Sequence, residues 1–222
     1  MSRSSAVGLL FGPDLVGLPT VAGPEASLTE IGPRSVWASV RQASGNHADT
    51  ASQVRSLCQQ SVRILLVIDA ATVVRPGWAR GGGRFAVIAD HLNLTGDNPL
   101  VGPNDPAWGP RFQDLTDAWD PSLRATLRRA ALDRGTDLCE GVVASLPGSA
   151  RTAAELNMLR MLGADMSSSG FVAEAITGRH AGRRVAGIAV LNTESKPAGD
   201  ARELVDLLDP LIAALEEADV PE

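Results

Sequence analysis

The sequence contains no tyrosine, and only two cysteines and three histidines among its 222 residues. Cys58 and Cys139 stand alone without CxxC spacing, so we expect two reduced thiols and neither a disulfide framework nor a metal site. No apolar run approaches the ~18 residues that a membrane helix needs. The longest, Ile64–Ile68, is strand-sized. The first apolar stretch is short and soon interrupted by Pro13, which argues against a secretory signal. We therefore expect a cytoplasmic protein with no membrane partner and no cofactor.

A basic surface is also lacking. The formal net charge is −6, and the isoelectric point lies near 5.1. Binding to nucleic acid draws on counterion release by a basic face, so we expect no nucleic-acid partner.

What the sequence does contain is a regular alternation of strand and helix patterns. The segment Val62–Ile68 is an uninterrupted run of β-branched residues and leucine, typical of a central strand buried on both faces. Amphipathic spacing predicts helices between the strands. The predicted strands are Val7–Leu10, Val36–Val40, Val62–Ile68, Phe85–Ala89, Glu140–Ser145 and Arg184–Leu191. The predicted helices are Asp49–Gln60, Pro121–Arg134, Thr152–Gly163, Phe171–Gly178 and Asp200–Asp219.

This alternation predicts a three-layer α/β/α fold with a central mixed β-sheet, as one domain over residues 1–222. Ligands of such sheets bind beyond the carboxyl ends of strands. Polar side chains expected near those ends are Asp69, His91, Arg151, Ser169 and Thr193.

The segment Asp90–Phe112 reads DHLNLTGDNPLVGPNDPAWGPRF. It resembles a hallmark stretch of the trimeric purine nucleoside phosphorylases. Shorter matches follow at Leu162–Asp165 and at Val172–Ala175, so the resemblance covers roughly residues 5 to 215. It implies the phosphorylase/hydrolase-like fold, a homotrimer, and a pocket for a nucleoside or purine-like small molecule near the subunit interface.

Several positions depart from the family's motifs. Its phosphate loop corresponds here to Gly12-Pro13-Asp14, where a carboxylate would repel phosphate, so phosphate is a doubtful ligand. The position of its base-reading glutamate holds Arg151, and Asp69 begins a turn that has lost two glycines. The family's Met-Ser pair corresponds to Ser169-Gly170. Its base-stabilising asparagine corresponds to Thr193, or to Asn192 after a shift of one residue.

Three residues are candidates for catalysis, each with a structural alternative. Asp69 is either a general base or a cap for the following turn. His47 is either the old phosphate-side histidine or a solvated loop residue. Arg151 either binds a carboxylate or phosphate in bidentate fashion or pairs with Glu155 on the next helical turn. Thr152 and Glu155 have the spacing of a capping box at the start of that helix.

The candidate ligand-binding residues come from the resemblance. His91 is expected to make a structural hydrogen bond in its loop, and Phe112 resembles the aromatic that a neighbouring subunit lends to the sugar site. The full set is Ala70, His91, Phe112, Ser169, Asn192 and Thr193.

Three functions remain open from the sequence. The first is cleavage of an N-glycosidic bond with altered specificity, by phosphorolysis or by hydrolysis. The second is a catalytically inactive homologue that binds a ligand or joins an active paralogue. The third is a repurposed catalyst of secondary metabolism that acts on a substrate other than a nucleoside, for which the charge of Arg151 is the motive.

Overall fold

The computed structural model describes residues 5–15, 24–42, 46–79, 83–148, 150–192 and 202–219. Strands and helices alternate along the chain as predicted. The strands are β1 (Val7–Phe11), β2 (Ser27–Ile31), β3 (Arg34–Val40), β4 (Ile64–Val73), β5 (Phe85–Asn93), β6 (Cys139–Ser145), β7 (Met166–Ser168) and β8 (Arg184–Asn192). The helices are α1 (His47–Gln59), α2 (Pro121–Leu132), α3 (Ala153–Met161), α4 (Val172–His180) and α5 (Arg202–Ala218).

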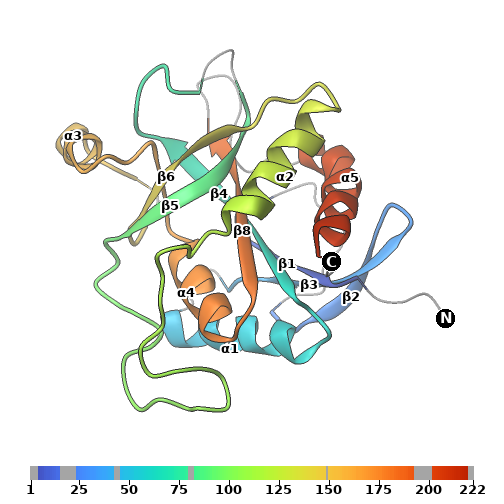
Figure 1. Cartoon of the computed structure of the whole chain (residues 1–222). Helices are drawn as coiled ribbons and strands as arrows, with labels where there is room; N and C mark the ends of the chain where they lie inside the picture. The colour runs from blue at the N-terminus through green and yellow to red at the C-terminus, as the bar shows by residue number, and fades with distance from the viewer. Residues whose placement is uncertain are drawn as a thin grey trace.

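Two pairs of helices cover opposite faces of the sheet (Figure 1). Helices α2 and α5 pack on one face, where Leu127 and Leu208 join the inward side chains of the strands. Helices α1 and α4 pack on the other face, where Leu57 and Ala175 do the same. The alternate residues of β4 point to the two faces in turn, as the period of a strand requires. The predicted three-layer α/β/α fold with a mixed central sheet is thereby confirmed.

Strand β4 organises the sheet, whose order is β2-β3-β1-β4-β7-β6-β5-β8. It runs parallel to β1 on one side and to β8 on the other, and its last two residues pair antiparallel with β7. Because β8 also pairs with β5, the sheet closes on itself through β4, β7, β6, β5 and β8. The residues that follow β1, β3 and β7 (Gly12, Arg41 and Gly170) meet at Asp69, which lies within β4.

Four of the described strands differ clearly from the prediction. Strand β4 continues to Val73, past the predicted end at Ile68, so that Asp69 lies within a strand and caps no turn. Strand β5 continues to Asn93, past the predicted end at Ala89. Strands β2 and β7 were not predicted, because β2 is a partly exposed edge strand and β7 has only three residues.

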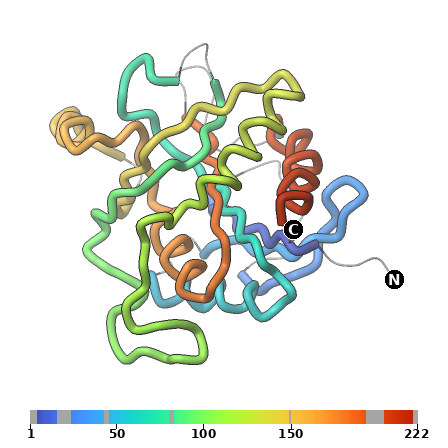
Figure 2. Tube along the Cα trace, viewed as in Figure 1, coloured from blue at the N-terminus to red at the C-terminus, as the bar shows by residue number. Residues whose placement is uncertain are grey.

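The long loop from residue 94 to 120 passes beside α1 and α4 (Figure 2). The guanidinium of Arg55 on α1 lies 5.6 Å from the ring centroid of Trp108. Asn104 donates a hydrogen bond to the carbonyl of Gly109, and its Oδ1 lies 3.2 Å from Nε2 of His180. These contacts hold the loop in place.

Helix α3 extends from the body of the molecule (Figure 1), with Leu159 as its one buried residue. The predicted capping box is present, since Thr152 and Glu155 each bond the backbone of the other. Gly163, with a φ of 91°, follows the helix. Met158, Met161 and Leu162 are 44%, 89% and 50% exposed, so much of the apolar surface of this segment faces outward.

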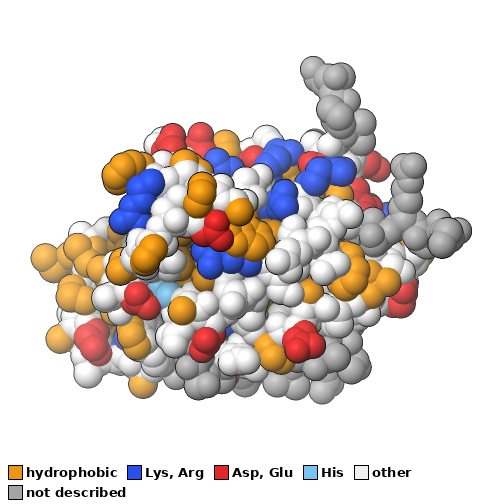
Figure 3. All heavy atoms as spheres, turned by 90° about the horizontal axis from the view of Figure 1, so that it is seen from below, with side chains coloured by type: hydrophobic (Ala, Val, Ile, Leu, Met, Phe, Trp, Pro, Cys, Tyr) orange, Lys and Arg blue, Asp and Glu red, His pale blue; other side chains and the backbone are white. Residues whose placement is uncertain are grey.

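Acidic and basic side chains are interspersed on the face seen in Figure 3, with hydrophobic side chains between them. Over the described residues, no helix is long and apolar enough to cross a membrane. Cys58 and Cys139 are both free thiols, as predicted.

Candidate functional site

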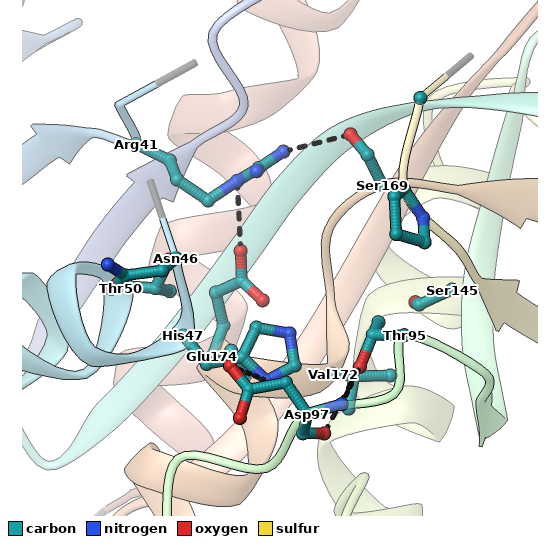
Figure 4. Close-up of a pocket in the computed structure, with 13 residues that line it drawn as sticks. Arg41, Asn46, His47, Thr50, Thr95, Asp97, Ser145, Ser169, Val172 and Glu174 are labelled. Atoms are coloured by element: carbon teal, nitrogen blue, oxygen red, sulfur yellow. Dashed lines mark hydrogen bonds and ion pairs between the residues drawn. The ribbon is translucent and has the colours of Figure 1, made fainter. Parts of the chain in front are cut away.

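A cavity of about 310 Å³ opens where the carboxyl ends of several strands meet the first turns of α1 and α4. Arg41 follows β3, Ser145 ends β6, and Ser169 follows β7. The labelled side chains converge on this space from five parts of the chain (Figure 4). The lining residues are Arg41, Asn46, His47, Thr50, Thr95, Asp97, Ser145, Pro147, Gly148, Ser169, Val172, Ala173 and Glu174. Ligands of α/β sheets bind beyond the carboxyl ends of strands.

At the base of the cavity, Arg41 is held between two buried carboxylates. Its Nη2 lies 2.7 Å from Oδ2 of Asp69, and its Nε lies 3.1 Å from Oε1 of Glu174. The three side chains are 7%, 4% and 2% exposed. Nη2 also donates a longer hydrogen bond of 3.4 Å to Oγ of Ser169. Buried charges occur in proteins mainly when they are paired in this way.

Asp69 fills the space between two glycines. A Cβ atom on Gly12 would lie 1.7 Å from its Oδ1, and one on Gly170 would lie 2.1 Å from its Oδ2. Neither glycine could therefore carry a side chain while the carboxylate stays in place. Oδ1 also accepts a hydrogen bond of 2.7 Å from the backbone N–H of Ala70. Asp69 is thus enclosed behind Arg41 and does not line the cavity.

Burial and pairing act against each other on these three groups. Burial raises the pKa of Asp69 and of Glu174, although the charge of Arg41 opposes this. Burial alone would lower the pKa of Arg41, yet the attraction of Asp69 and Glu174 outweighs it and the pKa is raised. The guanidinium therefore stays charged, while two carboxylates compete for one cation.

Glu174 is the third residue of α4, and it faces the amino-terminal end of that helix. Burial is the largest influence on its pKa, but the backbone N–H groups of Glu174 and Phe171 lower it. Phe171 precedes the helix with a φ of 81°, the left-handed region, and it is fully buried. Its ring packs edge-on against Trp119 with centroids 6.1 Å apart.

His47 is the first residue of α1, and Asn46 caps that helix by accepting a hydrogen bond of 2.9 Å from Asp49 N–H. Nδ1 of His47 lies 3.7 Å from Oδ2 of Asp97, which belongs to the loop after β5. The histidine side chain is 15% exposed and the aspartate 52% exposed. At 3.7 Å the two atoms form an ion pair only when the imidazole is protonated, and Nδ1 makes no hydrogen bond. His47 is the one histidine among the described lining residues, which makes it the cavity's candidate for proton transfer.

The structure brings two of the predicted site residues, His47 and Ser169, into the cavity wall. Asp69 lies one layer behind them, and Ala70 follows it on β4 with its carbonyl bonded to Ser168. Asn192 ends β8 and is exposed. Thr193 lies outside the described residues.

Arg151 contacts the backbone of its own turn, and its binding of an anionic group stays a prediction. Its guanidinium donates hydrogen bonds to four backbone carbonyls of its own turn, those of Leu146, Pro147, Gly148 and Ala150, at 2.8 to 3.4 Å. Thr152, in contrast, is the hydrogen-bond partner of Glu155. Arg151 therefore shapes the turn that carries Pro147 and Gly148 to the cavity, and it is not among the lining residues.

His91 makes the structural hydrogen bond expected of it. Its Nδ1 accepts from Nε1 of Trp119 at 3.0 Å, and burial lowers its pKa, so the ring stays neutral. Phe112 is 89% exposed on the long loop, away from the cavity of its own chain.

Arg41 and Glu174 were not among the candidates from the sequence. The sequence did hold an indication for Arg41, because Arg41 directly follows the predicted strand Val36–Val40. Asp69 follows the predicted strand Val62–Ile68 in the same way. Pairing the two required knowing that β3 and β4 flank β1. Among the described residues, no group of three or more His, Cys, Asp or Glu is placed to hold a metal ion.

A closed mixed sheet between two helical layers, with a polar cavity at the strand ends, defines an α/β protein of the phosphorylase type. The sequence model of the Phosphorylase superfamily matches residues 21–216, and the chain belongs to that superfamily. It is 39% identical over 140 residues to purine nucleoside phosphorylase 1 of Geobacillus stearothermophilus, covering 63% of this chain and 50% of the relative. It is 40% identical over 139 residues to purine nucleoside phosphorylase of Mycobacterium leprae, covering 62% and 47%.

The chain spans about half the length of these curated relatives. Among solved structures, the Schistosoma purine nucleoside phosphorylase in complex with hypoxanthine superposes with a TM-score of 0.79 and 23% identity. That superposition covers 98% of this chain and 92% of the other. At this identity the likeness shows the fold.

Proposed function

We propose that the chain binds a nucleoside-like ligand in the cavity beside Arg41 and cleaves its N-glycosidic bond, with a specificity that differs from its relatives. The observation that carries the proposal is the wall of neutral hydrogen-bonding groups, which come from Asn46, Thr50, Thr95, Ser145 and Ser169. Hydroxyl and amide groups suit the hydroxyls of a sugar, and a volume of about 310 Å³ is in the range of small-molecule sites.

The names of the relatives support the same ligand class. Two solved neighbours are Schistosoma purine nucleoside phosphorylase in complex with guanosine and with adenosine. We assign proton transfer to His47, which is the one histidine among the described lining residues. Proton transfer by a positioned imidazole contributes about 10²–10⁴-fold to a rate.

The test is release of free base from inosine, guanosine and adenosine at high protein concentration. We expect His47→Gln to lower the rate about 10²-fold or more, if the imidazole transfers a proton. Thr50→Val should weaken ligand binding, because Thr50 lines the cavity. Thr126→Val on α2 is the matched control, since its hydroxyl bonds only its own helix at the carbonyl of Ser122. Equal effects of the two threonine variants would contradict the assignment of the cavity.

A second candidate is ligand binding without catalysis. The pairing of Arg41 with Asp69 and Glu174 favours this second candidate. A guanidinium that is already paired with two carboxylates can stabilise little negative charge in a transition state. Titration calorimetry with the same nucleosides separates the two candidates, because a binding protein gives heat of binding and no free base. The third function open from the sequence, a non-nucleoside substrate, rested on Arg151, whose guanidinium bonds backbone carbonyls instead.

The chain's association into a homotrimer is part of the proposal. Three large apolar side chains stand in the solvent, Val101 at 81%, Phe112 at 89% and Met161 at 89% exposed. A neighbouring subunit that covered these side chains would bury their apolar surface.

A further inference from the structure

The turn that links β6 to α3 contributes Pro147 and Gly148 to the wall of the cavity, whereas Arg151 of the same turn is not among the lining residues. We propose that Arg151 is a positioning residue, which holds this part of the wall in the place where a ligand binds and so raises the affinity for the ligand. The inference deepens the proposed function and rests on it for the identity of the ligand. The effect of Arg151 on the turn itself is testable without a ligand.

The first support is the set of hydrogen bonds that the guanidinium makes. Nη1 donates to the carbonyls of Ala150 and Pro147, at 2.9 and 3.4 Å. Nη2 donates to the carbonyls of Gly148 and Leu146, at 2.8 and 3.1 Å. Because a guanidinium is planar and its N–H donors form a rigid fork, it fixes the positions of these carbonyls relative to one another. The backbone of both lining residues is therefore held to one side chain.

The second support is the conformational freedom of the two lining residues. Pro147 has no backbone N–H with which to stabilise the turn. Gly148 has a φ of 74°, in the left-handed region, and glycine reaches many other conformations without steric cost. Both residues are exposed, so packing restrains them little. Without the guanidinium, we expect this part of the chain to sample several conformations.

The third support is that fixed elements lie on either side of the turn. Before it, directly after β6, the N–H of Leu146 donates to the carbonyl of Ser168 at 3.0 Å. After it, Thr152 and Glu155 form the capping box that begins α3. A loss of the guanidinium contacts should therefore displace the residues in between, and two of these line the cavity.

This arrangement predicts a specific effect on the proposed reaction. If only a fraction of the molecules have the wall in its binding position, the apparent dissociation constant of the ligand rises by the inverse of that fraction. His47, to which we assign proton transfer, begins α1 and lies outside the turn. The chemical step should change little once the ligand is bound, so loss of Arg151 should act on KM more than on kcat.

The first test measures the order of the turn by ¹⁵N relaxation and needs no ligand. We expect the order parameter of the Gly148 N–H to fall from about 0.85 in the unaltered protein to below about 0.6 in Arg151→Ala. Methylguanidinium added to this variant should raise it again, because the ion can occupy the place of the lost side chain. Arg183→Ala is the matched control, since Nη2 of Arg183 donates to the carbonyl of Cys58, outside the cavity. An order parameter that is the same in Arg151→Ala and in the unaltered protein would overturn the proposal.

The second test compares KM and kcat for release of base from inosine. We expect Arg151→Ala to raise KM about tenfold or more and to change kcat less than about threefold, whereas Arg183→Ala should change neither constant. Methylguanidinium should restore KM in Arg151→Ala. Arg151→Lys should not restore it, because an ammonium group does not reproduce the fork of donors.

A second variant displaces the turn and keeps the guanidinium. A Cβ at Gly148 would lie 4.0 Å from Nη1 of Arg151, an ordinary contact, but the residue would be strained at its positive φ. We therefore expect Gly148→Ala to raise KM as well. An unchanged KM in both Gly148→Ala and Arg151→Ala would overturn the inference.

Two further results would overturn it. One is a fall in kcat that equals or exceeds the rise in KM. The other is a loss of affinity in Arg151→Ala for inosine 5′-monophosphate but not for inosine, since Arg151 would then contact an anionic ligand directly. No binding and no base release by the unaltered protein would contradict the proposed function, and the order parameter of Gly148 would still decide whether Arg151 holds the turn.

Discussion

Nη2 of Arg41 lies 2.7 Å from Oδ2 of Asp69, although the two residues are 28 positions apart and both side chains are almost wholly buried. Parallel pairing of β3 and β4 on either side of β1 brings them together. This contact, with Glu174 on the other side of the guanidinium, sets the charge of the candidate site and part of the stability of the fold.

Replacement of Arg41 by an uncharged residue should therefore lower the free energy of unfolding. Arg41→Met leaves Asp69 and Glu174 buried without a partner, and we expect a loss of about 3–5 kcal/mol in the free energy of unfolding. Arg34→Met is the control: its contacts with Asp209 and Glu216 lie at the surface and should contribute about 1 kcal/mol or less. Urea unfolding of the two variants gives the comparison, and equal losses would mean that the buried cluster is not held by Arg41.

The buried carboxylates also predict a dependence of stability on pH. The pKa of Glu174 in the folded protein is raised above its ordinary value of 4.5, mainly by burial. The folded state then binds a proton more tightly than the unfolded state, so stability falls as the pH rises above 4.5 and through the folded pKa. Glu174→Gln removes one such group. We expect a smaller decline of Tm over this range in the variant, and an unchanged decline would exclude Glu174 as a source.

For Asp120 we expect the opposite dependence, a loss of stability as the pH falls into the acid range. Burial opposes the change, but hydrogen bonds from Arg184 and from the N–H of Leu123 lower the pKa of Asp120 to about 2. Its contribution is present above the ordinary value of 3.8 and is lost as the pH falls toward 2. We expect Asp120→Asn, which keeps the cap of α2, to be less stable at neutral pH by about 1 kcal/mol or less, because the group is partly exposed.

The difference between the two proteins should shrink as the pH falls below 4. Asp120→Ala removes the cap as well as the charge, and we expect a further loss of about 1 kcal/mol that persists in acid. Thermal unfolding at several pH values tests both statements. A gap between wild type and Asp120→Asn that stays constant down to pH 2 would refute the role of the charge.

The exposed apolar residues predict association. Light scattering behind a sizing column should give the mass of a trimer for the unaltered chain. Phe112→Ser or Met161→Ser should shift the mass toward the monomer if these side chains are covered by a neighbour. Leu132→Ser at the end of α2, where the side chain is 59% exposed, is the control for loss of apolar surface as such. A monomeric unaltered chain would contradict the trimer.

The three layers of the fold could be predicted from the sequence, because the helices and strands that form them show in the local periodicity of apolar residues. The run at Ile64–Ile68 identified the central strand, and the helices α1, α2 and α4 began within about two residues of their predicted starts. Strand β7 could not be predicted from local periodicity, since Met166–Ser168 is a strand only through its pairing with β4 and β6.

The candidate site was predicted less completely than the fold. His47 and Ser169 were found because they stand in recognisable segments at the ends of elements. Arg151 was assigned a ligand by analogy with a position in the family's motif, whereas its two Nη atoms donate to carbonyls within five residues of it. Arg41 was missed because an ion pair across 28 residues depends on which strands are neighbours, and local patterns do not contain that information.

The positive φ of Phe171 allows backbone strain to be measured by comparing two substitutions at this residue. A non-glycine residue at a φ of 81° costs about 1–3 kcal/mol, and here the buried ring beside Trp119 offsets that cost. Phe171→Ala and Phe171→Gly remove the same ring contacts, but only glycine also relaxes the backbone. The difference between the free energies of unfolding of these two variants therefore reports the conformational strain at residue 171. This residue lies just before α4, where the chain turns from Ser169 toward Glu174.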